Sequence, residues 1–153
     1  MSLKAIALLS IGLWVGTIAV AGYLFFAGIT TPSTDGRIKV YLSAGERDFV
    51  LGEMRGMLEG IRDITLSLAN GEREKARAIA VANGMASVGG VNLLLMAKLP
   101  VSFMSLGKDT HQKFDAIASA LANQESPQNI QLRIGTLMNN CVSCHSTYSL
   151  MAK

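Results

Sequence analysis

The chain has 153 residues, half of them hydrophobic and 16% charged, and it carries a formal net charge of +3 at pH 7. This length allows one small domain with a single core in addition to a membrane segment. The positive charge is mild, lysine and arginine form no cluster, and aromatic residues make up only 6% of the chain, so we expect no nucleic-acid partner.

The first 30 residues contain one long apolar segment. It has no charged residue from Ala5 to Ile29, and a helix of that length, about 37 Å, spans a ~30 Å hydrocarbon core with some tilt. Lys4 stands just before the segment, which favours a cytoplasmic N-terminus. We therefore predict an uncleaved transmembrane anchor over residues 1–30 and an exported domain after it.

A cleaved signal peptide is the alternative for the same segment. Ala19-Val20-Ala21 has the small residues of a cleavage site. The apolar run continues beyond that site through Tyr23-Leu24-Phe25-Phe26, and cleavage would leave these residues in water, so the anchor is preferred. Residues 31–42, which begin with Thr, Pro, Ser and Gly, are predicted to be a linker.

The exported part shows helical periodicity and no convincing strand alternation. The first predicted helix begins at Ser43, where Glu46 three residues later indicates a capping box, and it ends at Asn70-Gly71. The second is predicted from Glu72 to about Lys98, where Leu99-Pro100 breaks the pattern.

The third predicted helix covers roughly Lys108 to Ala122, after a hydrophobic connection over residues 101–107. The fourth begins at Ser126-Pro127, because serine is a good cap and proline suits the first helical position. Its inward seam recurs at three- and four-residue steps: Ile130, Ile134, Leu137, Cys141, Cys144 and Tyr148. These patterns predict an all-α fold, an antiparallel four-helix bundle over residues 43–153 that follows the membrane helix.

The last predicted helix carries Cys141-Val142-Ser143-Cys144-His145, which holds the two cysteines of the chain. Two thiols one helical turn apart can each add to a vinyl group on one edge of a porphyrin, and the next side chain then lies under the ring. The motif therefore indicates one covalently attached haem c, with His145 as the proximal iron ligand. Thioether-linked haem is usually assembled outside the cytoplasm, so we expect a single-pass protein of a bacterial inner membrane with its domain in the periplasm.

The cysteine pair has two other interpretations. A redox dithiol usually occupies βαβ surroundings, which the helical pattern does not offer. A zinc site needs two further ligands, and His111 is the one histidine outside the motif. Haem attachment is preferred to both.

The sequence resembles cytochrome c′ and its low-spin class II monohaem relatives. The resemblance rests on the C-terminal Cys-x-x-Cys-His, the four helices, Tyr148 three residues past the histidine, and Leu99-Pro100 followed by Phe103 and Gly107. It covers about Glu46 to Leu150. Two features differ from the family: Ser149 stands where a basic residue is usual, and most members are soluble.

The ligand opposite His145 decides the function. Met151 follows His145 too closely to reach the far face of a porphyrin. The resemblance implies that a methionine on the first helix takes this position, which favours Met54, with Met57 as second choice. An open site covered by Leu51 or Leu58 is the alternative, and His111 is expected to be a surface residue.

The resemblance also implies an arginine on the first helix that meets the haem propionates, and Arg47 is the candidate. Arg55 is less well aligned.

Two functions follow from these predictions. With His/Met ligation the chain would be an electron carrier, held by its anchor beside a membrane-bound redox partner. With five-coordinate iron it would bind nitric oxide or carbon monoxide, as cytochrome c′ does. The carrier is preferred, an enzyme is not expected because no set of acid–base residues accompanies the motif, and family members often form homodimers.

Overall fold

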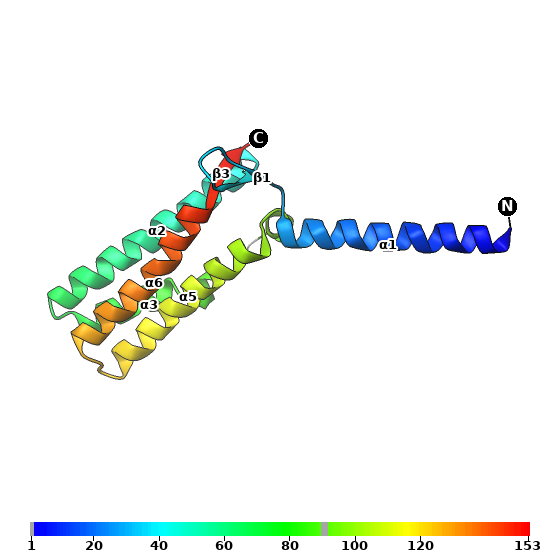
Figure 1. The fold of residues 1–153 in the computed structure, drawn as a ribbon. Helices are drawn as coiled ribbons and strands as arrows, with labels where there is room; N and C mark the ends of the chain where they lie inside the picture. Colours follow the sequence, from blue (N-terminus) through cyan, green and yellow to red (C-terminus); the bar gives the residue numbers. More distant parts are fainter. Residues whose placement is uncertain (1, 90–91) are drawn as a thin grey trace.

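The chain begins with an isolated apolar helix, α1 (Leu3–Ala27), in a computed structural model that describes residues 2–89 and 92–153. The Ser2 side chain caps it by accepting a hydrogen bond from the Ala5 amide. None of its residues is buried, and it is long and apolar enough to cross a membrane. In Figure 1 it extends away from the rest of the protein, with the N-terminus at its far end.

A three-stranded sheet follows α1, where a linker was predicted. Strands β1 (Thr30–Pro32) and β2 (Ile38–Leu42) are antiparallel, and β2 pairs in parallel with the C-terminal strand β3 (Tyr148–Ala152). The predictions of a linker over residues 31–42 and of helix at Tyr148 were therefore wrong. Buried and exposed residues do alternate along β2, where Val40 and Leu42 are buried. Five residues are too few to identify a strand from this alternation. The partner strand is also distant in sequence, since Ile38 pairs with Tyr148, 110 positions later.

Helix α2 (Ala44–Ala69) begins and ends as predicted. Ser43 and Glu46 form the capping box, and Asn70 caps the C-terminus ahead of Gly71, whose φ is 75°. Glu46 also accepts hydrogen bonds from Lys98 Nζ at 2.6 and 2.8 Å, which joins the start of α2 to the segment before α5.

The Glu46 carboxylate should make stability depend on acid. The hydrogen bond from Lys98 and the capping contacts lower the pKa of Glu46 from 4.5 to about 2. Because the folded-state pKa is depressed, the stabilisation is complete above pH 4.5 and is lost as the pH falls toward 2. We expect Glu46→Gln to lower the free energy of unfolding near neutral pH and to differ little from wild type near pH 2, measured by denaturant titration in detergent. Lys98→Met should weaken the same pH dependence, and an unchanged wild-type profile in either variant would contradict the assignment.

The predicted second helix is wrong beyond its first ten residues. In its place stand α3 (Arg73–Ala82), a 3₁₀ turn η1 (Met85–Val88) and the short helix α4 (Leu93–Met96), while residues 90–91 lie outside the described part of the chain. The break occurs at Gly84, where Asp115 of the neighbouring helix accepts a hydrogen bond from the Met85 amide at 3.0 Å. A Cβ at Gly84 would lie 1.9 Å from Asp115 Oδ1, so the contact requires glycine.

Gly84→Ala is expected to destabilise the protein by about 2 kcal/mol, because the carboxylate must move and give up its hydrogen bond to Met85. Gly56→Ala is the matched control, since a Cβ there meets nothing within 4 Å. It should leave stability unchanged or raise it by up to ~1 kcal/mol through helix propensity. Thermal unfolding of the two variants side by side checks the difference, and equal stabilities would refute the role given to Gly84.

Helix α5 (Val101–Ala122) starts directly after Pro100, seven residues earlier than predicted, so the expected hydrophobic connection is helical. Helix α6 (Pro127–Thr147) begins after the predicted cap, Ser126, and is followed directly by β3, which begins at Tyr148. Helices α2, α3, α5 and α6 pack along one another, and the sheet lies at the end of this body that is nearest α1 (Figure 1).

Within the described part of the chain, the buried side chains form two separate clusters. The lower cluster lies among α2, α3, α5 and α6 and contains Ile61, Ile64, Ala76, Ala80, Phe114, Ile117, Ala118, Ala120, Leu121, Ile130, Ile134 and Leu137. The upper cluster lies beside the sheet and contains Val40, Leu42, Leu95, Leu99, Phe103 and Tyr148. The core is thus divided at the level of the cysteine motif.

Candidate functional site

The last two turns of α6 position the cysteine motif. Cys141 and Cys144 are both free thiols and both half-buried, one turn apart on the same side of the helix. Cys141 packs against the lower cluster and Cys144 against the upper cluster. The two thiols therefore lie on either side of the division in the core.

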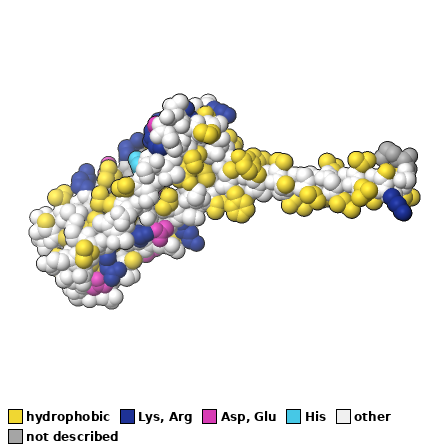
Figure 2. Space-filling model, in the orientation of Figure 1, with side chains coloured by type: hydrophobic (Ala, Val, Ile, Leu, Met, Phe, Trp, Pro, Cys, Tyr) yellow, Lys and Arg dark blue, Asp and Glu magenta, His cyan; other side chains and the backbone are white. Residues whose placement is uncertain are grey.

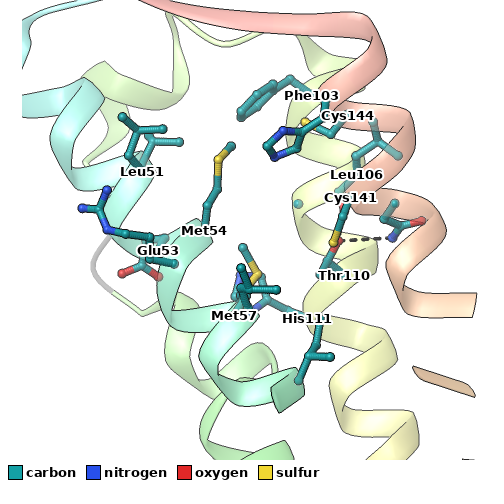
Figure 3. A pocket seen from close by; sticks show the side chains of 17 residues that line it. Leu51, Glu53, Met54, Met57, Phe103, Leu106, Thr110, His111, Cys141 and Cys144 are labelled. Carbon is teal, nitrogen blue, oxygen red and sulfur yellow. Dashed lines mark hydrogen bonds between the residues drawn. The ribbon is translucent and has the colours of Figure 1, made fainter. Parts of the chain in front are cut away.

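A mostly apolar cavity of about 400 Å³ occupies that division. It is bounded by Ile61 at the lower cluster and Phe103 at the upper one, and it includes both thiols and His145. The other lining residues are Val50, Leu51, Glu53, Met54, Arg55, Met57, Leu58, Leu106, Gly107, Thr110, His111 and Asn140. Figure 3 shows these side chains converging from α2, α5 and α6.

Two methionines enter the cavity from α2, opposite α6. Met54 packs against the upper cluster, as Cys144 does, and Met57 packs against the lower cluster, as Cys141 does. In Figure 3 the Met54 side chain extends from α2 into the cavity, toward the side that carries Cys144. The two predicted ligand candidates are thus brought to the same cavity as the motif.

The thiols do not have the electrostatics of a redox dithiol. Burial raises the pKa of Cys141, and burial together with the charge of Cys141 raises the pKa of Cys144. Reactive dithiols need a lowered pKa so that the thiolate forms. Within the described residues, no three His, Cys, Asp or Glu side chains are grouped closely enough to share a metal ion.

His111 is not a surface residue, so that prediction was wrong. It is half-buried in the cavity lining, and its Nδ1 lies 2.8 Å from the carbonyl oxygen of Asn83 and 3.4 Å from Ser87 Oγ. Donation from Nδ1–H to the carbonyl leaves Nε2 as the nitrogen with a free lone pair. Four residues at three- and four-residue steps or adjacent on α5 face the cavity: Phe103, Gly107, Thr110 and His111. A helix predicted to start at Val101 would have placed His111 on this face.

A polar network beside Cys141 was also missed. Asn140, only 8% exposed, donates to Asp109 Oδ2 at 2.7 Å and to Thr110 Oγ1 at 3.2 Å, and its Oδ1 accepts from Lys113 Nζ at 3.3 Å. The hydrogen bonds from Lys113 and Asn140 hold the pKa of Asp109 below its usual range. The network joins α5 to α6 and fixes the turn that carries the first thiol.

Tyr148 lies in the upper cluster, behind the cavity-lining residue Phe103. Its ring packs edge-on against Phe103 at 5.3 Å between centroids, and its hydroxyl lies 2.5 Å from Ser102 Oγ. Tyr148 is buried, as the predicted seam position required, although a strand and not a helix places it there. Met151 also belongs to β3, beyond the end of α6.

The Arg47 side chain contacts β3 and does not line the cavity, among the residues that the structure describes. Its Nε donates to the Leu150 carbonyl at 3.1 Å, and Asp48 lies 3.8 Å away. Among the described residues, the cavity lining includes Arg55 but not Arg47. The predicted propionate contact of Arg47 stays a prediction, and Arg55 is the arginine that the geometry places at the cavity.

Comparison with protein-family models, with curated proteins and with solved structures found no match for this chain. The resemblance to cytochrome c′ therefore rests on the sequence features that suggested it.

Proposed function

We propose that the chain is a membrane-anchored c-type cytochrome, which transfers single electrons to or from a membrane-associated redox partner in the bacterial periplasm. In this proposal α2, α3, α5 and α6 form an antiparallel four-helix bundle around one covalent haem c. The anchor is α1, and it stays attached.

The observation that carries the proposal is the divided core. One mostly apolar cavity interrupts the packing between the upper and lower clusters. It is lined by Cys141, Cys144 and His145 of the motif and by the two methionines Met54 and Met57. Its size, about 400 Å³, falls within the ~300–1,000 Å³ typical of cofactor sites. Burial raises the pKa of both thiols, which disfavours the thiolate that a redox dithiol needs.

Each residue has a defined task in this proposal. The thiols of Cys141 and Cys144 would each add S–H across a vinyl group, forming one C–S bond per cysteine without a leaving group. His145 would hold the iron on one side, and Met54 would hold it on the other. Haem, when bound, supplies a one-electron couple at its iron, and His/Met ligation raises its potential and leaves no open position.

Anchoring supports the role of a carrier. A domain tethered to the bilayer by α1 meets a membrane-bound partner at a raised effective concentration. Hydrogen bonds from Asn140 tie α6 to α5 beside the cavity, and the packing of Tyr148 on Phe103 ties β3 to α5.

A five-coordinate gas-binding protein is the second candidate, and one observation favours it. Leu51 and Leu58 line the same cavity from α2, so an apolar cover is available if Met54 does not bind iron. Optical spectra of the purified ferric and ferrous protein, with and without carbon monoxide, separate the two. A low-spin ferric spectrum with a far-red band and little reaction with carbon monoxide supports the carrier, whereas rapid carbon monoxide binding to the ferrous wild type supports gas binding.

A further inference from the structure

We propose that the outer face of α4, formed by Leu93, Leu94 and Met96, lies in the interfacial layer of the bilayer that α1 crosses. This inference rests on the proposed membrane span of α1. It adds a second point of contact between the domain and the lipid.

The exposure of α4 is unusual for a short helix in a folded domain. Leu93 is 78% exposed, Leu94 70% and Met96 40%, while Leu95 between them is 4% exposed and packs into the upper cluster. The Asn92 side chain caps α4 by accepting a hydrogen bond from the Leu94 amide at 2.8 Å. The helix therefore holds one apolar side chain inside and presents three outward.

The chain after α4 touches the end of the anchor. The Ile29 amide donates to the Lys98 carbonyl at 2.9 Å, and a Cβ on Gly28 would lie 2.5 Å from that carbonyl oxygen and 2.7 Å from the Pro100 nitrogen. Gly28 has φ 65° and ψ −163°, a conformation that favours glycine, so this backbone contact is built into the junction. Met96 is two residues before Lys98, which places the α4 face beside the point where α1 ends.

Figure 2 shows hydrophobic side chains continuing from α1 onto the part of the domain that adjoins it. An isolated patch of exposed apolar residues can bind several kinds of partner. A patch that is continuous with a membrane helix is best explained by contact with lipid. The occupant is therefore the bilayer surface at the exported end of α1.

The scarcity of charge around this face suits a lipid surface. No aspartate or glutamate occurs from Met85 to Lys108, and Lys98, the charged residue next to α4, is paired with Glu46. An apolar patch with little unpaired charge beside it fits the apolar part of the bilayer interface. Because Leu95 packs with Phe103 and Tyr148, seating α4 in the lipid would also fix the orientation of the candidate site relative to the membrane.

Photolabelling of the full-length protein tests the inference. The protein is reconstituted into phosphatidylcholine/phosphatidylglycerol vesicles that contain a lipid with a diazirine near the glycerol, irradiated and mapped by peptide mass spectrometry. We expect lipid adducts in α1 and in the peptide that contains residues 92–96. The α6 peptide around Leu132, which is 71% exposed, should carry none and serves as the matched reference.

Leu93→Ser/Leu94→Ser should reduce labelling of residues 92–96 to the level of the α6 peptide and leave labelling of α1 unchanged, whereas Leu132→Ser should change neither. Labelled α1 with unlabelled α4 overturns the inference and leaves the anchor standing. If α1 itself is unlabelled, the membrane span in the proposed function is wrong and the inference falls with it. Cross-links between the α4 segments of two copies, in place of lipid adducts, overturn it in favour of a dimer contact.

Discussion

Replacing Met54 with alanine is expected to abolish the far-red absorption band of the ferric protein. That band arises from thioether–iron ligation, and Met54 enters the cavity from α2 on the side opposite the motif helix. Loss of the ligand should also lower the reduction potential by on the order of 100 mV, because methionine ligation raises it. Absorption spectra and a potentiometric titration of the purified variant measure both effects.

Met57→Ala is the control, because Met57 lines the same cavity from the same helix but packs against the lower cluster. It should keep the far-red band. His111 lines the same cavity and is a possible replacement ligand, so the spin state of Met54→Ala is compared with that of Met54→Ala/His111→Ala. A far-red band that survives Met54→Ala and disappears in Met57→Ala would show that Met57 is the ligand.

Removing both thiols is expected to cost most of the stability of the domain. In Cys141→Ala/Cys144→Ala no thioether can form, and a mostly apolar cavity of about 400 Å³ is left between the two clusters. Without a bound group, the apolar side chains that line this cavity lose their packing partner, and a small domain has only about 5–15 kcal/mol of stability to lose. We expect far-UV circular dichroism to persist and near-UV circular dichroism to be lost, as in a molten globule.

Val142→Ala is the matched control, since Val142 lies between the two cysteines and is 67% exposed. It should retain the haem and change stability by less than ~0.5 kcal/mol. A double cysteine variant that unfolds cooperatively with wild-type stability would show that the core does not depend on a group bound at the cavity.

The parts of the fold that the sequence predicted are those with local causes. The apolar length of residues 5–29 predicts α1, and Ser43 with Glu46 predicts the start of α2, because these features act within one or a few turns. Ser126 followed by Pro127 identifies the start of α6 for the same reason. The meeting of Met54, Cys141 and Cys144 at one cavity agrees with the predicted inward seam of α6 and with the choice of Met54 as the candidate on the first predicted helix.

The parts that were missed depend on contacts between distant segments. Parallel pairing of β2 with β3 joins residues more than a hundred positions apart, and no local pattern encodes that pairing. The break after α3 depends on Asp115, which occupies the space a side chain at Gly84 would fill. His111 and Asn140 were missed because their roles require the packing of α5 on α6 and the contact with Asn83.

The mass of the intact native protein tests the central claim most directly. If Cys141 and Cys144 carry thioether bonds, the polypeptide purified from a host able to attach haem c retains one haem after acid–acetone extraction. Its mass then exceeds that of the bare chain by one haem, and neither cysteine reacts with iodoacetamide under denaturing conditions. A mass equal to that of the bare chain, with both thiols alkylated, would contradict the account.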